Sequence, residues 1–360
     1  MKILDKYLLK QFLLTVLFGL LAFTLLFVVI DLMENLGDFL DQNVSEPMII
    51  QYYLVFTPEI IRLITPIAVL LASLFTAGKM ANLNELTAIK ASGVSLYRFM
   101  LPFLAAAVVI SVFSIYFGGY LVPMANKHKI YIEQTYMKKG IVYLGTNIFL
   151  QDSKTRVVTM SSFDPDRGQA HMISIQEFDP NDNTKLISQV NAFRMVYDPA
   201  IKCWVAYEGV VRNFTDSTET LEKFQMKEFR QLNFKVDDVI KKQRKPEEMT
   251  LAELKDFANE QFRTGNDPTA IDIEYHSRIA FAFASVVVIL FGVPISSNKR
   301  RGGLALQIGI NLLVTFLYLV FMKVSQAFGK NGVMNPLITA WLANIIFLCV
   351  AFYNIKIAQK

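Results

Sequence analysis

The 360-residue sequence is poor in the residues that build catalytic and metal centres. It has three histidines and two cysteines. His128, His171 and His276 are far apart in the chain, and none belongs to a His-Glu-x-x-His arrangement. Cys203 and Cys349 offer neither a disulfide framework nor a Cys-x-x-Cys metal motif. We therefore expect no metal site and no structural disulfide.

Motifs for nucleotide hydrolysis and for serine hydrolases are also missing. A P-loop needs a Gly-Lys pair followed by Ser or Thr, and neither Gly-Lys pair, at positions 78–79 and 329–330, meets this condition. No serine lies in a Gly-x-Ser-x-Gly elbow. The apolar segments lack the several carboxylates of a proton or sodium relay. The chain is therefore predicted to be no enzyme, to need no cofactor of its own, and to do mechanical or binding work driven by another protein.

Apolar residues are abundant. They make up 53% of the chain, with 29 Phe and a mean hydropathy of +0.36, whereas soluble domains usually contain about 45–50%. The net charge of +5 is spread along loops instead of forming a basic tract. This distribution favours a membrane protein oriented by its charges over a nucleic-acid-binding protein.

Six apolar segments are long enough to cross a bilayer, for which a helix needs about 20 residues. They cover residues 12–30, 49–78, 99–123, 279–297, 304–322 and 336–353. The loop after the first segment carries only acidic charges, whereas basic residues gather after the second and fourth segments and at the C-terminus. The positive-inside tendency then predicts cytoplasmic termini and an external region between spans three and four. The loop at residues 323–333 has two lysines although this count places it outside.

Residues 126–267 have the composition of a soluble domain. Six segments show partial alternation and many β-branched or aromatic residues: 146–151, 156–163, 169–179, 185–197, 202–214 and 221–234. Turn signals rich in Asp, Pro and Gly separate them. This pattern predicts an antiparallel sandwich, jelly roll or open barrel. Thr250 and Glu253 then form a capping box that opens a helix, and a second helix starts near Pro268.

The second span contains a charged pair, Glu59 and Arg62, between Pro58 and Pro66. A charge inside a membrane is costly unless it is paired or faces a cavity. Residues three apart lie on the same helical face, so an intrahelical ion pair is one interpretation. A substrate-facing role is the other, and the two are compatible.

A polar segment, residues 82–95 (NLNELTAIKASGVS), separates spans two and three. Its neighbours are basic and its one acidic residue is Glu85, which places it in the cytoplasm. Its leucines and isoleucine recur near a helical period, and Gly93 is expected to end the helix. Such a helix either inserts into a groove of a soluble partner or lies on the lipid surface.

Taken in order, these motifs resemble the lipopolysaccharide-export permease family, the LptF/LptG type of ABC-transporter transmembrane subunit. The matching pieces are Leu4-Asp5-Lys6-Tyr7, Pro58-Glu59 with Pro66, Asn84-Glu85-Leu86-Thr87-Ala88, Ala91-Ser92-Gly93-Val94-Ser95, and Gly292-Val293-Pro294 with Asn298-Lys299-Arg300-Arg301-Gly302-Gly303. The layout matches over the entire chain. The first motif favours the LptG type.

The resemblance implies two homologous six-span subunits that enclose an outward-opening cavity in the bacterial inner membrane. A cytoplasmic ATPase dimer would use the ATP, and no nucleic acid would be involved. Lipopolysaccharide would enter from the outer leaflet and pass to periplasmic jelly rolls and a single-span periplasmic bridge component. The ATPase-coupling residues would be Asn84, Glu85, Leu86, Ala91, Ser92 and Gly93. The candidates for substrate binding are Arg62, Glu59, Lys127, Lys323 and Lys330.

The expected fold class is an α-helical membrane protein with six transmembrane helices and an inserted, jelly-roll-like all-β periplasmic domain. Residues 1–125 would hold spans one to three with a cytoplasmic coupling helix at about 82–92. Residues 126–245 would form the β domain, 246–278 the connecting helices, and 279–360 spans four to six. An alternative function is a mechanotransmitting ABC membrane subunit that moves its external domain without carrying substrate. A membrane-anchored periplasmic enzyme would need a cluster of convergent polar side chains, which the sequence does not indicate.

Overall fold

The computed structural model of the chain describes residues 3–139, 146–164, 167–182, 184–199, 201, 203–215, 218–236, 238–239, 245–263, 266–296, 303–332 and 334–358. The chain divides into two compact units. The first, here called the helical unit, comprises Met1–Lys138, Glu247–Leu254 and Thr269–Lys360. The second, the β unit, comprises Lys139–Pro246 and Lys255–Pro268. The basic run at 241–244 and the basic turn at 299–301 lie outside the described residues.

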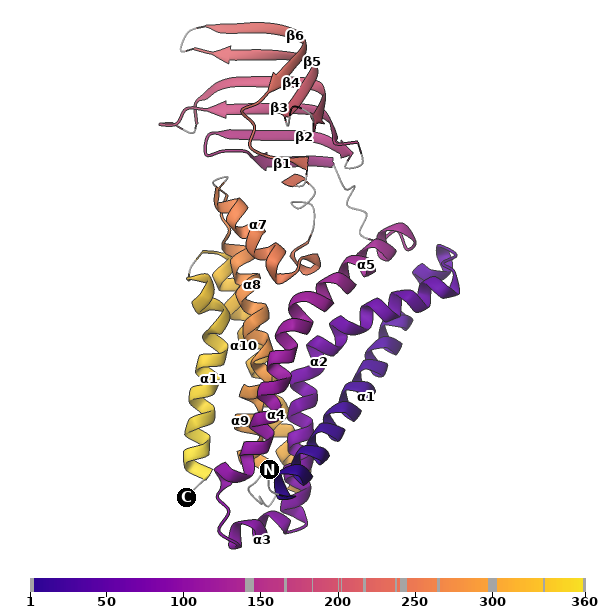
Figure 1. Cartoon of the computed structure of the whole chain (residues 1–360), viewed down its shortest axis with the longest axis vertical. Coiled ribbons are helices and arrows are strands. Elements are labelled where there is room, and N and C mark those ends of the chain that lie inside the picture. Colours follow the sequence, from indigo (N-terminus) through magenta and orange to yellow (C-terminus); the bar gives the residue numbers. More distant parts are fainter. Residues whose placement is uncertain are drawn as a thin grey trace. The chain divides into compact units, whose positions relative to one another are not determined.

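Among the described residues, six helical stretches are long and apolar enough to cross a membrane, which confirms the predicted number of spans. They are built from α1 (Ile3–Asp41), α2 (Glu46–Asn82), α4 (Leu96–Tyr116) with α5 (Val122–Thr135), α8 (Thr269–Ala282) with α9 (Ala284–Ser296), α10 (Gly303–Lys330) and α11 (Pro336–Ala358) (Figure 1). A π-helical turn, η1 (Phe117–Leu121), joins α4 to α5. The third stretch thus runs on to Thr135, well beyond the expected end near residue 123, because α5 continues the helix with polar residues.

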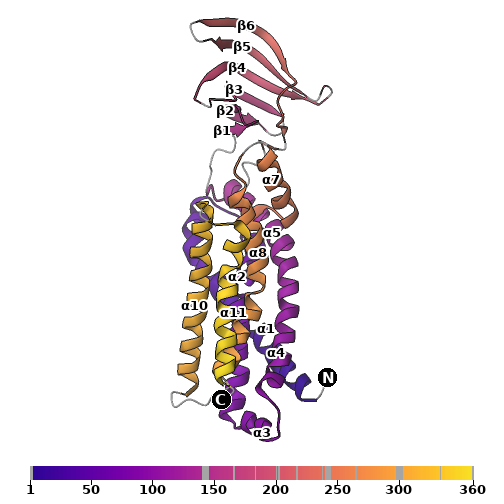
Figure 2. The same ribbon diagram turned by 90° about the vertical axis from the view of Figure 1, so that its left-hand side faces the viewer.

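The larger apolar cluster of the helical unit contains residues of α1, α2, α3, α4, α9, α10 and α11, and a second cluster joins α1, α2 and α5. Phe12 of α1 meets Phe103 of α4 edge to face, at 5.3 Å between ring centroids. Helices α2 and α9 pack closely because Gly292 has no side chain: a Cβ there would lie 2.9 Å from Leu70 Cδ1. Helices α10 and α11 run side by side (Figure 2).

Many apolar side chains of the helical unit face outward. Phe18 and Leu25 of α1 are 74% and 67% exposed, and Phe316 of α10 is 65% exposed. In water such a surface would be unfavourable. It is the surface expected of helices that meet lipid or a second membrane subunit.

The β unit contains one six-stranded antiparallel sheet whose strands follow sequence order. They are β1 (Thr146–Gln151), β2 (Arg156–Asp164), β3 (Gln169–Phe178), β4 (Leu186–Asp198), β5 (Cys203–Phe214) and β6 (Glu219–Phe229). The inserted all-β domain is thereby confirmed. Each described strand pairs with its neighbours in sequence, as in a meander, and none of them makes a Greek-key crossover.

The chain after β6 returns over the apolar side of the sheet. Phe234 joins the core cluster of the strands, and its ring lies 5.0 Å from that of Trp204 in a tilted arrangement. Trp204 Nε1 donates to the Phe234 carbonyl at 2.8 Å. The buried Asp152 carboxylate accepts the backbone N–H groups of Asn233 and Phe234 at 2.6 and 3.1 Å. This return explains why the last strand ends at Phe229 and not at the expected residue 234.

Helix α7 (Leu251–Arg263) begins at the predicted capping box. Glu253 Oε2 accepts from the Thr250 N–H at 2.8 Å, and Thr250 Oγ1 accepts from the Glu253 N–H at 3.3 Å. Two backbone donors of the first turn are thus satisfied by side chains from the same turn. A short 3₁₀ turn, η2 (Pro246–Glu248), precedes it.

Candidate functional site

The polar segment between α2 and α4 forms helix α3 (Glu85–Ala91), with a turn at each end. Asn84 enters it with φ of +58°, and Gly93 leaves it with φ of +84°. The Val94 N–H donates to the Ile89 carbonyl at 3.3 Å, the bond of a Schellman-type helix end. Gly93 therefore ends the helix as predicted, because its left-handed conformation favours glycine.

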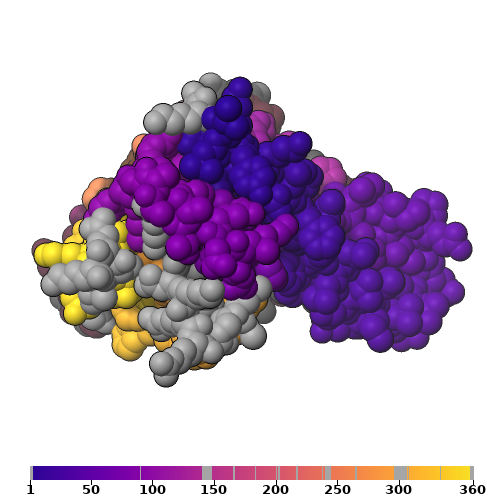
Figure 3. Space-filling model, turned by 90° about the horizontal axis from the view of Figure 1, so that it is seen from below, coloured from indigo at the N-terminus to yellow at the C-terminus, as the bar shows by residue number. Residues whose placement is uncertain are grey.

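The residues of α3 divide into an anchoring and an exposed group. Leu86 is 2% exposed and belongs to the core of the helical unit. Glu85 is half-buried, whereas Asn84, Ala91, Ser92 and Gly93 are exposed. In the view from below, the segment lies on the end face of the helical unit and borders the start of α1 (Figure 3). Four of the six candidate coupling residues are therefore exposed, Glu85 is partly accessible, and the buried Leu86 holds the segment in place.

An ion pair that the sequence does not predict fixes the chain directly after α3. Ser95 caps α4 by accepting the Arg98 N–H at 3.3 Å. The Arg98 guanidinium then donates from Nη2 to Asp5 Oδ2 of α1 at 2.8 Å. The Asp5 side chain is 11% exposed, so the pair is partly shielded from water. A single acidic residue among the lysines of the N-terminus is the sequence signal for it.

At Glu59 and Arg62, the intrahelical ion pair is confirmed. Arg62 donates from Nε to Glu59 Oε2 at 3.0 Å and from Nη2 to Oε1 at 2.5 Å. Its guanidinium also lies over the Phe281 ring, 5.7 Å from the centroid. Both sides of the guanidinium are thus engaged within the helical unit.

Arg278 of α8 lies next to this pair and is not among the predicted site residues. Its side chain is 7% exposed, and Nε donates to Glu274 Oε1 at 3.1 Å. The cavity that Arg62 and Arg278 line together has about 10 Å³ of open space, about that of a single water molecule. Both arginines have carboxylate partners and little free volume, so the arrangement shown has no room for a lipid phosphate between them.

The three lysines predicted to bind substrate have different surroundings from Arg62. Lys127 of α5 and Lys323 and Lys330 of α10 are exposed, and in the described part of the chain their side chains make no hydrogen bond or ion pair. Lys323 and Lys330 are seven residues apart and share a face of α10. Lys129, by contrast, pairs with Glu133 at 3.4 Å. The three exposed lysines are available to anionic groups, and they come from two different helices.

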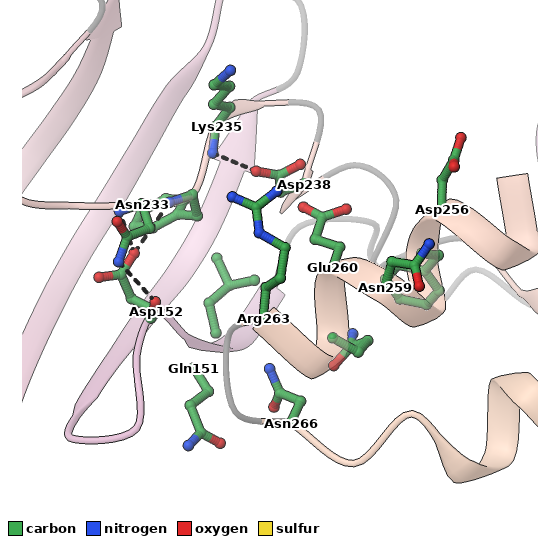
Figure 4. A pocket seen from close by; sticks show the side chains of 14 residues that line it. Gln151, Asp152, Asn233, Lys235, Asp238, Asp256, Asn259, Glu260, Arg263 and Asn266 are labelled. Atoms are coloured by element: carbon green, nitrogen blue, oxygen red, sulfur yellow. Dashed lines mark hydrogen bonds between the residues drawn. The ribbon is translucent and has the colours of Figure 1, made fainter.

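A cavity of about 580 Å³ lies within the β unit, between the end of β1, the chain after β6 and α7. Arg263 reaches across it toward Asp238, whereas Asp152 turns to Asn233 (Figure 4). Its described lining contains no His, Cys or Ser, so no nucleophile with a histidine base faces it. Over the described residues, no group of three His, Cys, Asp or Glu that could hold a metal is found.

Comparison with known proteins covers nearly the whole chain. Residues 6–356 match the family described as "Lipopolysaccharide export system permease LptF/LptG". The "Lipopolysaccharide export system permease protein LptF" of Escherichia coli (strain K12) is similar to the chain, with 22% identity over 97% of this chain and 93% of that protein. The proteins of the same name from Escherichia coli O157:H7 and Shigella flexneri give the same values. The preference for the LptG type stays a prediction.

Proposed function

The chain belongs to the LptF/LptG family of lipopolysaccharide export system permeases, and on this premise we propose that it is a membrane subunit that carries lipopolysaccharide. It would extract the lipid from the outer leaflet of the inner membrane and pass it to a periplasmic bridge component toward the outer membrane. The observation that carries this proposal is the family match over residues 6–356 on a chain with six spans and an inserted β unit. In this role both termini and α3 face the cytoplasm, and the β unit lies in the periplasm.

Helix α3 docks on a separate ATPase dimer, which hydrolyses the ATP, so this chain needs no cofactor of its own. Support comes from the form of the segment: a short helix with a fixed end at Gly93, anchored by Leu86 and exposed at its rim. A helix that is already folded and is held by a buried anchor loses little conformational entropy when it docks into a partner's groove. It can therefore pass a movement of the partner on to the spans. Glu85 provides the charge of the contact, and Asn84, Ala91, Ser92 and Gly93 form its rim.

Lipopolysaccharide brings acyl chains and phosphates, and the helical unit offers chemistry for both. Exposed apolar side chains on α1 and α10 suit the acyl chains. Lys127, Lys323 and Lys330 suit the phosphates because they are exposed cations. Glu59 and Arg62 take part as a pair, and Arg62 reaches a phosphate only when the pair opens. A second, homologous permease subunit closes the cavity and adds its own cations.

Site-specific photocrosslinking in the assembled complex tests this function. A photoreactive residue replaces exposed residues around α1, α2 and α10, starting with Phe18, Leu63 and Phe316. We expect lipopolysaccharide adducts on one face of these helices, with yields that change when the ATPase is active. A complex with a hydrolysis-defective ATPase is the control. Absence of adducts at every exposed position would favour the mechanotransmitting alternative.

A further inference from the structure

The third span contains an irregular turn at its centre. The π-helix η1 (Phe117–Leu121) interrupts an otherwise continuous helix from Leu96 to Thr135, and the Val122 N–H donates to the Phe117 carbonyl. π-Helical turns are rare and often mark functional positions. This one contains two adjacent buried glycines, Gly118 and Gly119.

Gly119 forms a notch that is filled by a side chain from a distant segment. A Cβ at this position would lie 2.4 Å from Leu251 Cδ1 and 2.8 Å from Leu251 Cγ. Non-bonded contacts of a Cβ atom are essentially never this short, so any larger residue at 119 displaces Leu251. At Gly118 the nearest atom is Arg62 Cδ at 3.1 Å, on a side chain that can shift. The first residue of α7 is therefore seated in the π-helical turn of the third span.

A second contact holds the same place from the fourth span. Arg278 Nη1 donates to the Met249 carbonyl at 2.6 Å, directly before the capping box of α7. A charge-assisted bond from a guanidinium with 7% exposure is strong. Met249 and Leu254 are themselves buried, at 2% and 0% exposure. The root of α7, defined here as residues 249–254, is thus fixed by spans three and four together.

The root belongs to the helical unit, whereas Lys255–Pro268 of the same segment belongs to the β unit. We infer that Gly119, Leu251 and Arg278 are positioning residues of a rigid joint, within the helical unit, through which spans three and four move the root of α7 during transport. The joint is rigid because the notch leaves no slack around Leu251 and the Arg278 bond is short. The inference rests on the proposed function, since it assigns these residues a part in the lipid transport cycle.

The first test compares two glycine variants in the full complex with its ATPase. Gly119→Leu displaces Leu251, whereas Gly37→Leu is the control, because no atom lies within 4 Å of a Cβ at position 37. We expect Gly119→Leu to lower ATP-dependent release of lipopolysaccharide by at least about fivefold, the lower range of a typical coupling between sites. The variant should still copurify with the ATPase, and ATP hydrolysis by the purified complex should stay unchanged; a misfolded chain would not copurify. The Gly37→Leu complex should release lipid as the wild type does.

A size-compensating pair covers the case in which Gly119→Leu does not fold. Gly119→Ala alone meets Leu251 Cδ1 and Cγ, but Leu251→Ala removes both atoms and leaves the two Cβ atoms 3.7 Å apart, an ordinary contact. The double variant should therefore release more lipid per ATP than Gly119→Ala. If the double variant is no better than Gly119→Ala, the notch does not act through Leu251 and the inference is overturned.

A disulfide distinguishes a rigid joint from a hinge. Gly119→Cys with Leu251→Cys brings two Cβ atoms to 3.7 Å, within the roughly 3.5–4.5 Å that disulfides span; Cys349, which is exposed, is replaced by Ser. We expect the oxidised complex to release lipopolysaccharide at the rate of the reduced one. Arrest on oxidation that a reductant reverses would overturn rigidity. Failure of the wild-type complex to release lipid would overturn the proposed function and the joint, whereas wild-type release by Gly119→Leu would overturn the joint alone.

Discussion

Glu85 is the residue on which the proposed ATPase contact depends most directly. It is half-buried at the start of α3, next to the buried anchor Leu86. Glu85→Lys reverses its charge and leaves the anchor in place, so the chain should fold and insert as before. Losing a charge pair at an interface commonly costs about 2–5 kcal/mol, so ATPase association or transport should fall by roughly tenfold or more.

Copurification of the ATPase and a transport assay measure this effect. Glu222→Lys is the matched control, because it makes the same charge change on exposed β6. If Glu85→Lys supports full transport, Glu85 is not part of the ATPase contact.

Asp5 and Arg98 offer a second test at the same end of the helical unit. Their 2.8 Å pair ties the chain leaving α3 to the first helix. Asp5→Arg or Arg98→Asp places like charges together, which should lower transport per ATP hydrolysed. The double reversal restores opposite charges and should recover most of it, with a coupling of about 0.5–3 kcal/mol between the two sites. A double variant no better than the single ones would show that the residues do not act as a pair.

At the scale of elements, Asp152 of the β unit holds the chain after β6 against the sheet. Its side chain is fully buried and accepts Arg156 Nη1 at 3.1 Å in addition to two backbone N–H groups. Asp152→Ala leaves the two backbone N–H groups unpaired, whereas Arg156 keeps its bonds to the Gln231 carbonyl and to Glu177. Each buried unsatisfied donor costs about 1–3 kcal/mol, so we expect the free energy of unfolding of the β unit to fall by about 2–6 kcal/mol. Asp152→Asn keeps one acceptor oxygen, so it should lower the free energy of unfolding less.

Thermal unfolding of the full chain, followed by Trp204 fluorescence in a Trp341→Phe background, measures the loss, since Trp204 bonds to the segment that Asp152 holds. Glu222→Gln, on the exposed edge strand, serves as a reference that should not change stability. If Asp152→Ala unfolds at the wild-type temperature, the clamp is not what keeps the chain after β6 on the sheet.

Elements that rest on local chemistry could be predicted from the sequence. The first five strands start and end within one residue of the predicted bounds, because alternation and turn residues are local signals. The Thr250 cap and the Gly93 helix end are local as well. The Asp5–Arg98 pair and the Leu251–Gly119 seat join residues far apart in sequence. A local sequence pattern does not predict contacts of this kind, because they form only when distant segments pack together.

The same limit applies to the candidate site. Glu59 and Arg62 could be paired from their spacing because a helix sets the distance between residues three apart. Arg278 could not be placed beside them, since α8 reaches α2 only in the folded helical unit. The inward position of Leu86 likewise depends on core residues from other helices.

At the scale of the whole molecule, the proposed function makes the chain one part of a larger assembly. Its helical unit exposes long apolar faces on α1 and α10, and its exposed lysines come from separate helices. A single copy would leave these apolar faces open to the membrane. Its exposed lysines would have no anionic partner among the described residues. The second permease subunit and the anionic lipid of the proposed function would account for these features.

The most direct measurement of the central claim is the yield of lipopolysaccharide adducts at Phe18 and Phe316 in the assembled complex, compared between active and hydrolysis-defective ATPase. Our account predicts adducts in both complexes and a change in their yield when ATP is hydrolysed, because the lipid enters the helical unit and is then driven out of it. No adduct at any exposed position of α1, α2 or α10, while ATP hydrolysis proceeds, would contradict it.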